Sequence, residues 1–130
     1  MNEEQKNIQA NLLIVEDDSF ISGLLQRRFA QEDYGIFNAT NSEAALEVLK
    51  KNKINLILLD IILPGVDGIT FLENLKKDPA FKDIPVIITS NLGQPEEIEK
   101  GIQAGAIDYI VKANATPDEI VEKVKSILKK

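Results

Sequence analysis

Acidic side chains stand at the ends of two of the most apolar stretches in this chain. Asp60 directly follows the run INLILL, and Glu16, Asp17 and Asp18 lie at the end of the run NLLIVE. Carboxylates about 5 Å apart repel each other by roughly 3 kcal/mol per pair at an effective dielectric near 20, so a cluster of them needs a counter-charge. Mg²⁺ suits such a site, because it binds one or two carboxylates together with water and phosphate oxygens.

Two further polar residues end apolar runs. Lys112 would add a fixed positive charge, and the hydroxyl group of Ser90 can donate a hydrogen bond to an anion. Carboxylates, a divalent cation, a lysine and a hydroxyl are suited to phosphoryl transfer, in which catalysis is mostly positioning and charge stabilisation. Asp60 is the candidate nucleophile, because acyl phosphates form on aspartate and this residue lies at the tip of the middle run.

Five short apolar runs predict the strands that would position these side chains. The runs are rich in Ile, Val and Leu and do not alternate with polar residues, which is typical of strands buried on both faces of a parallel sheet. The predicted strands are residues 11–16, 35–40, 54–59, 84–90 and 106–112.

Segments with helical spacing of apolar residues lie after each predicted strand. We expect Ser42 to cap the second helix and Asp67 the third, and we expect Phe20 to lie on the apolar side of the first, with Leu24 and Phe29. The predicted helices are residues 19–31, 42–52, 68–78, 95–105 and 117–130.

The alternation of five strands with five helices predicts an α/β fold with a doubly wound, five-stranded parallel sheet. Ligands of such sheets bind beyond the carboxyl ends of the strands, where the acidic residues, the lysine and the serine would meet. A chain of 130 residues is one ordinary domain. We expect a frayed tail over residues 1–10 and a single domain over residues 11–130.

Composition excludes several kinds of protein. The formal charge of −6 argues against direct binding of nucleic acid, which needs a concentrated positive surface. The chain has no cysteine and no histidine, so it lacks thiolate chemistry and the commonest general base. No apolar run approaches the roughly 20 residues of a membrane span, and we expect no membrane association and a cytoplasmic protein.

Four motifs together resemble the receiver domain of two-component response regulators. They are LLIVEDD, LILLDIILPGVDG, PVIITSN and GAIDYIVKA, and the resemblance covers about residues 11–129. It implies a flavodoxin-like (βα)5 three-layer sandwich with the strand order 2-1-3-4-5. It also implies that Mg²⁺ is the cofactor.

The resemblance also implies a role for each matching residue. Asp60 corresponds to the phosphoacceptor, Lys112 to the lysine that pairs with a phosphoryl oxygen, and Ser90 to the switch hydroxyl. Tyr109 corresponds to the aromatic residue that swings inward when this hydroxyl moves. Glu16, Asp17, Asp60 and the backbone carbonyl of Ile62 would provide the metal ligands, with Glu16 acting mainly through water, whereas Asp18 would lie outside that set.

The expected partners follow from the same resemblance. The phosphoryl donor would be a histidine kinase or a histidine phosphotransfer protein. A downstream protein would bind the face formed by the fourth helix, the fifth strand and the fifth helix. We expect a stand-alone receiver without an output domain, a monomer or a phosphorylation-dependent dimer, and no turnover of an external substrate. The chain would catalyse only its own phosphorylation and dephosphorylation.

Several alternatives stay open. A receiver-like scaffold that is never phosphorylated is compatible with Asn91 after the switch serine and with Ala113 after Lys112, where many members have a cis proline. A phosphohydrolase would need a second acid at position 62, which is isoleucine, and an FMN carrier would need an uncharged phosphate loop after the first strand. With apolar Ile62 and Leu92 beside the site, we predict a long-lived aspartyl phosphate.

Overall fold

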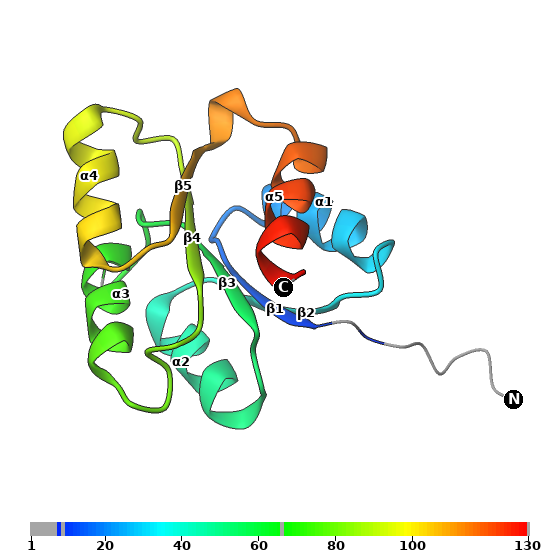
Figure 1. Ribbon diagram of the computed structural model, residues 1–130, viewed down its shortest axis with the longest axis horizontal. Helices are drawn as coiled ribbons and strands as arrows, with labels where there is room; N and C mark the ends of the chain where they lie inside the picture. Colours follow the sequence, from blue (N-terminus) through cyan, green and yellow to red (C-terminus); the bar gives the residue numbers. More distant parts are fainter. Residues whose placement is uncertain (1–7, 9, 66, 130) are drawn as a thin grey trace, which may run out of the picture.

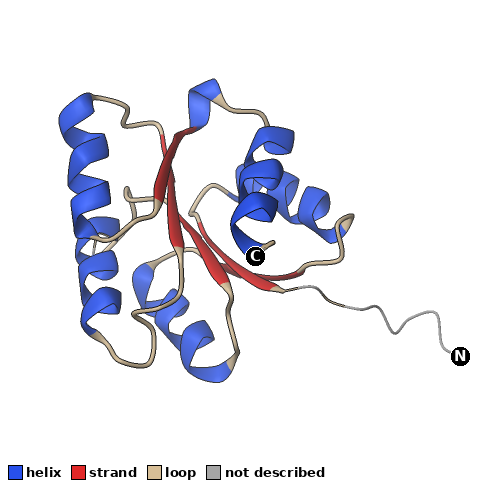
Figure 2. Ribbon diagram, in the orientation of Figure 1, coloured by secondary structure: helices blue, strands red, loops and turns tan. Residues whose placement is uncertain are grey.

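Five strands pair side by side into one parallel sheet (Figure 2). The structure is a computed structural model that describes residues 8, 10–65 and 67–129, so most of the predicted tail lies outside the described residues. The order β2-β1-β3-β4-β5 confirms the predicted topology. The strands are β1 (Asn11–Val15), β2 (Gly35–Ala39), β3 (Leu56–Leu59), β4 (Val86–Ser90) and β5 (Asp108–Val111).

The strands β3, β4 and β5 each begin two residues later than predicted, and local contacts explain the first two of these differences. Pro85 has no N–H group to donate to the sheet, so β4 begins at Val86, although the Pro85 carbonyl still accepts a hydrogen bond from the Ile57 N–H group at 3.0 Å. The amide side chain of Asn55 accepts a hydrogen bond from the backbone of Asn11 at 2.8 Å, and β3 begins after it. The carboxyl ends of the strands, which hold the polar residues, are not affected by these differences.

Helices cover both faces of the sheet and complete three layers (Figure 1). Alternate residues of β1 serve different cores: Leu12 and Ile14 pack with residues of α1 and α5, whereas Leu13 and Val15 pack with residues of α2 and α3. No helix in the part of the chain that the structure describes is long and apolar enough to span a membrane. The helices are α1 (Ser19–Ala30), α2 (Ser42–Lys51), α3 (Gly68–Lys77), α4 (Pro95–Ala104) and α5 (Pro117–Leu128).

Helix caps agree with the sequence except in α2. Asp67 accepts a hydrogen bond from the Thr70 N–H group and caps α3 as predicted. The predicted cap Ser42 is wrong: Asn41 caps α2 by accepting a hydrogen bond from the Ala44 N–H group at 2.8 Å, and Ser42 is already helical. Asn and Ser are equally good caps, so the sequence could not separate these neighbours.

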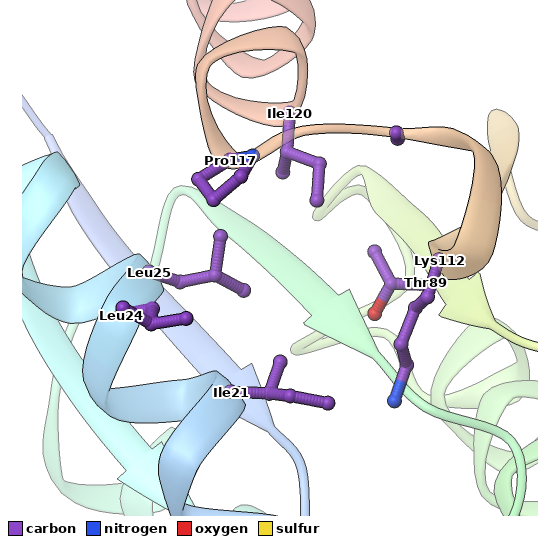
Figure 3. A pocket seen from close by; sticks show the side chains of 8 residues that line it. Ile21, Leu24, Leu25, Thr89, Lys112, Pro117 and Ile120 are labelled. Carbon is purple, nitrogen blue, oxygen red and sulfur yellow. The ribbon is translucent and has the colours of Figure 1, made fainter.

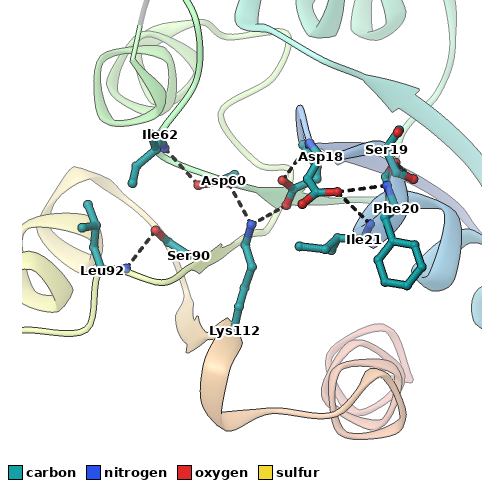
Figure 4. Close-up of polar contacts among 11 residues, drawn as sticks. Asp18, Ser19, Phe20, Ile21, Asp60, Ile62, Ser90, Leu92 and Lys112 are labelled. Atoms are coloured by element: carbon teal, nitrogen blue, oxygen red, sulfur yellow. Dashed lines mark hydrogen bonds and ion pairs between the residues drawn. The ribbon is translucent and has the colours of Figure 1, made fainter.

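Phe20 was also placed wrongly by the spacing argument. Its side chain is 71% exposed, whereas Leu25 and Phe29 of the same helix are buried. Because Asp18 is the N-cap, Phe20 belongs to the first turn of α1 (Figure 4), and its side chain is exposed there.

Charged residues join α1 to α5 on one face of the sheet. Arg28 pairs with Asp118 at 2.5 Å, and Glu32 pairs with Lys125 at 3.1 Å and with Arg28 at 3.3 Å. The hydrogen bonds from Lys125 and Arg28 hold the pKa of Glu32 below its ordinary value of 4.5. The charged form of Glu32 therefore stabilises the fold.

We expect Glu32→Gln to lower the urea midpoint of unfolding at neutral pH. A carboxyl group whose pKa is lowered by folding stabilises the protein above its unfolded pKa, and this contribution is lost as the pH falls through the folded value. The difference between the variant and the parent should therefore disappear in acid well below pH 4.5. A difference of equal size at neutral and acidic pH would contradict this explanation.

Candidate functional site

Lys112 joins two buried carboxylates at the carboxyl ends of the strands (Figure 4). Its ammonium group lies 2.6 Å from Glu16 Oε1 and 2.9 Å from Asp60 Oδ2. The three side chains are 13%, 4% and 8% exposed, respectively, so water screens these ion pairs only weakly. Lys112 is the first residue of the short 3₁₀ helix η1 (Lys112–Asn114), not the last residue of β5 as predicted.

Burial and ion pairing have opposite effects on the pKa of Lys112. Burial alone would lower the pKa of Lys112, but the hydrogen bonds to Glu16 and Asp60 outweigh it and raise the pKa above its ordinary value. Burial raises the pKa of Glu16, and the Lys112 ammonium together with the Asp18 N–H group offsets part of that increase. The Lys112 ammonium group therefore stays charged at neutral pH.

A third carboxylate completes an acidic cluster. Glu16, Asp17 and Asp60 each offer an oxygen atom, and these oxygens all lie within 4.8 Å of one another. Glu16 and Asp17 follow β1 and Asp60 follows β3, and these strands are neighbours in the sheet. Three carboxylates are the hard oxygen donors that Mg²⁺ prefers, so the residues fit a divalent cation as predicted.

Asp18 and Ile62 lie beside this cluster with different contacts. Asp18 Oδ1 accepts hydrogen bonds from the Phe20 and Ile21 N–H groups, which makes it the N-cap of α1 and keeps it out of the carboxylate cluster. The N–H group of Ile62 donates to Asp60 Oδ1 at 2.9 Å and orients that carboxylate. The proposed metal contact of the Ile62 carbonyl stays a prediction.

The two predicted switch residues meet at one peptide segment. Ser90 is fully buried, and its hydroxyl oxygen accepts a hydrogen bond from the Leu92 N–H group at 3.2 Å. The Tyr109 hydroxyl donates to the Leu92 carbonyl. Burial raises the pKa of Tyr109, and a hydrogen bond with Ser90 offsets part of that increase. The backbone of Leu92 thus links Ser90 to Tyr109.

Thr89, the neighbour of Ser90, lies near Lys112 on the face of the sheet that α1 and α5 cover. It lines a pocket of about 170 Å³ between α1 and α5, together with Ile21, Leu25 and Ile120 (Figure 3). Consecutive strand residues face opposite sides of a sheet, so Thr89 and Ser90 differ in their surroundings. The assignment of Ser90 to the site stays a prediction.

Two backbone features shape the loops around the site. Among the described residues no peptide bond is cis, so Lys112–Ala113 is trans and the ammonium still reaches both carboxylates. Gly68 lies so close to the loop after Asp60 that a β-carbon would stand 2.7 Å from the Asp60 carbonyl oxygen and even closer to Ile61 Cα. Helix α3 therefore approaches this loop too closely to accommodate a side chain at position 68.

We expect Asp17→Asn to raise the free energy of unfolding by about 1 kcal/mol when EDTA is present. Two unit charges about 4 Å apart repel by about 1 kcal/mol in a water-like dielectric, and Asp17 is the exposed member of the cluster. Urea denaturation with EDTA and with Mg²⁺ measures this, and the variant should lose part of the stabilisation by Mg²⁺. Asp18→Asn is the matched control: it makes the same charge change outside the cluster and should not stabilise the protein.

The sequence missed two contacts of this site. It predicted that Lys112 would add a positive charge to the site, but not that Lys112 contacts Glu16 and Asp60 directly, because the reach of a side chain depends on the loop that carries it. It also treated Leu92 only as an apolar neighbour, whereas the backbone groups of Leu92 make the contacts. No sequence signal marks such a contact, since any residue provides the same backbone groups.

Comparisons with known proteins agree with this geometry. The family model described as response regulator receiver domain matches residues 12–125. The phosphate regulon transcriptional regulatory protein PhoB of Escherichia coli (strain K12) is 33% identical over 119 residues, which are 92% of this chain and 52% of that protein. The chain spans about half the length of the curated relatives it matches.

Solved structures give the same picture. A response regulator receiver domain protein (CheY-like) from Methanospirillum hungatei JF-1 has a TM-score of 0.85 and 28% sequence identity, covering 95% of each chain. The Mn(2+)-bound form of response regulator Rcp1 has a TM-score of 0.80 and 26% identity, covering 90% of this chain and 92% of its own.

Proposed function

Because the chain belongs to the response regulator receiver domain family, we propose that it is a phosphorylation-controlled signalling domain whose phosphoacceptor is Asp60. One observation carries the proposal: the Lys112 ammonium lies between Asp60 and Glu16 with a third carboxylate alongside. A carboxylate nucleophile, a fixed cation and a cluster of oxygen ligands are the parts that phosphoryl transfer needs.

The proposed reaction forms one bond and breaks one. An oxygen of the Asp60 carboxylate attacks phosphorus, and the bond from phosphorus to the donor breaks, leaving its electron pair on the donor. The donor is a phosphorylated imidazole of a histidine kinase or a histidine phosphotransfer protein, or acetyl phosphate in the test tube. This chain has no histidine, so the donor is a separate group. The Lys112 ammonium stabilises the negative charge on the phosphoryl oxygens.

The carboxylates of Glu16, Asp17 and Asp60 and the Ile62 carbonyl would hold Mg²⁺. When bound, this ion neutralises charge on the carboxylates and on the phosphoryl oxygens. The fit of the three carboxylates supports the assignment, and so does the likeness to the Mn(2+)-bound Rcp1 structure. Glu16 is already paired with Lys112, so it would act mainly through a water molecule.

Phosphorylation would alter the partner surface through Ser90 and Tyr109. In the proposal, a phosphoryl group on Asp60 draws the Ser90 hydroxyl inward, Tyr109 follows, and the face of α4, β5 and α5 changes its affinity for a downstream protein. The exposed side chains Ile102 and Ile107, which are 43% and 50% exposed, support a protein partner at the α4–β5 edge. The surface is acidic overall, which disfavours direct binding of nucleic acid by this domain.

A cytoplasmic location and a monomer or phosphorylation-dependent dimer remain parts of this proposal. They agree with a diffusible switch that binds other proteins. The alternative is a receiver-like scaffold that is never phosphorylated. It would have the same fold, but its Asp60 would not accept a phosphoryl group.

The deciding experiment is intact-mass measurement after incubation with acetyl phosphate and Mg²⁺. We expect the parent to gain the mass of one phosphoryl group and Asp60→Asn to gain none. EDTA should suppress the gain in the parent. A parent protein that folds and gains no mass, and whose stability does not respond to beryllium fluoride with Mg²⁺, would identify the scaffold instead.

We expect the aspartyl phosphate to be long-lived, with a half-life of many minutes. Hydrolysis needs a polar group to orient the attacking water, and the side chains beside Asp60 are apolar at Ile62, which is 54% exposed, and at Leu92. A phosphate-release assay measures the lifetime. Ile62→Asn should shorten it by adding an amide that can hold water, and a half-life of seconds for the parent would contradict the prediction.

A further inference from the structure

Helix α4 contains a buried glycine three residues before its end. Gly101 has helical neighbours on both sides, and glycine is a poor helix former in such interior positions. We therefore expect contacts that exclude a larger residue at this position.

The packing around Gly101 supplies these contacts. A β-carbon on Gly101 would lie 3.1 Å from Cδ2 and 3.2 Å from Cε2 of Tyr109, and 2.6 Å from Cδ1 of Ile88. The ring of Tyr109 therefore lies against the backbone of α4, where a β-carbon would crowd the ring and would overlap the end of the Ile88 side chain. By contrast, the nearest atom to a β-carbon on Gly23, inside α1, is Arg27 Nη1 at 3.8 Å.

The far end of the same ring is also held. The hydroxyl group of Tyr109 donates to the Leu92 carbonyl, and the Leu92 N–H group donates to Ser90. The ring thus runs from the space at Gly101 to the segment that contacts Ser90. An aromatic ring is rigid, so moving one end away from α4 also moves the hydroxyl at the other end.

We infer that Gly101 is a positioning residue for Tyr109. Because Gly101 has no side chain, it leaves a space, here called the seat, in which the ring lies when its hydroxyl group reaches Leu92. The consequence for signalling rests on the proposed switch role of Tyr109, whereas the seat itself does not. A side chain at position 101 should displace the end of Ile88 and push the ring outward, which weakens the contact of the Tyr109 hydroxyl with Leu92.

The test compares Gly101→Ala with its parent in a Tyr34→Phe background, in which Tyr109 is the only tyrosine. Burial raises the pKa of Tyr109, so displacement of the ring should shift its phenol titration to lower pH. The near-UV circular dichroism of this single tyrosine should lose most of its intensity. Gly23→Ala makes the same change in a helix with free space and should leave both signals unchanged.

A double-mutant cycle covers the case in which Gly101→Ala folds poorly. In a Tyr109→Ala background the ring is gone, so the same substitution should raise the urea midpoint or lower it much less than in the parent. Equal effects in the two backgrounds, or an unchanged phenol titration and dichroism in a folded Gly101→Ala protein, would overturn the inference. These readouts need no phosphate. Failure of the parent to gain phosphate would overturn the proposed function while leaving the seat for Tyr109 in place.

Discussion

Lys112→Met should slow phosphorylation of Asp60 by acetyl phosphate about 100-fold. The ammonium group lies 2.9 Å from Asp60 Oδ2, and removing one preorganised charge or donor from a site of this kind typically costs two to three orders of magnitude in rate. Intact mass followed over time, with saturating Mg²⁺, measures the loss. A rate within threefold of the parent would mean that Lys112 only balances the charge of its neighbours.

The same substitution should lower the free energy of unfolding by about 2 kcal/mol at pH 7. Removing one partner of a buried ion pair costs about 3–5 kcal/mol, and the 13% exposure of Lys112 together with proton uptake by the acids reduces that value. The loss should shrink in acid, because a protonated Glu16 no longer needs a partner. Lys77→Met, which removes an exposed lysine at the end of α3, is the matched control and should change neither rate nor stability.

Gly68→Ala should destabilise the fold by about 3 kcal/mol and also slow phosphorylation at least tenfold. The new β-carbon would clash with backbone atoms of Asp60 and Ile61, and backbone atoms cannot turn away as a flexible side chain can. The loop after β3 must therefore move and take the Asp60 carboxylate with it. Urea denaturation and the acetyl phosphate assay measure the two effects.

Gly23→Ala separates this clash from the general effect of replacing glycine. Gly23 lies inside α1 with free space around it, and alanine is the better helix former by about 1 kcal/mol. We expect this control to be slightly more stable than the parent and equally fast. If Gly68→Ala behaved like the control, the approach of α3 to the loop would not constrain the site.

The repeated patterns of the sequence were enough to predict the order of elements and the place of the site. Continuous apolar runs identified the strands, and the acids after β1 and β3 were brought together by the neighbouring positions of these strands. The strand order itself came from the resemblance of the motifs, since no local pattern specifies which parallel strands are neighbours. Asp60, Lys112 and the acidic cluster therefore lie together as expected.

Details that depend on one bond or one turn of helix could not be predicted. Asn41 caps α2 in place of Ser42, and Phe20 is exposed, and local spacing predicts neither. The link through Leu92 involves only backbone atoms, and the seat at Gly101 depends on a ring from another element. Glycine in an amphipathic helix is visible in the sequence, but what it makes room for is not.

The ion pairs that join α1 to α5 affect which surfaces of this molecule can change shape when a partner binds. Arg28 of α1 and Glu32 just after that helix pair with Asp118 and Lys125 of α5, so ion pairs brace this side of the sheet. Helix α4 instead packs on α3 and β5, and the segment at Leu92 is held by Tyr109 and Ser90. Deformation should concentrate in the unbraced half. Under the proposed switching, a protein that touches α1 would meet a nearly constant shape. A protein would distinguish the phosphorylated from the unphosphorylated form mainly through α4, β5 and the segment at Leu92.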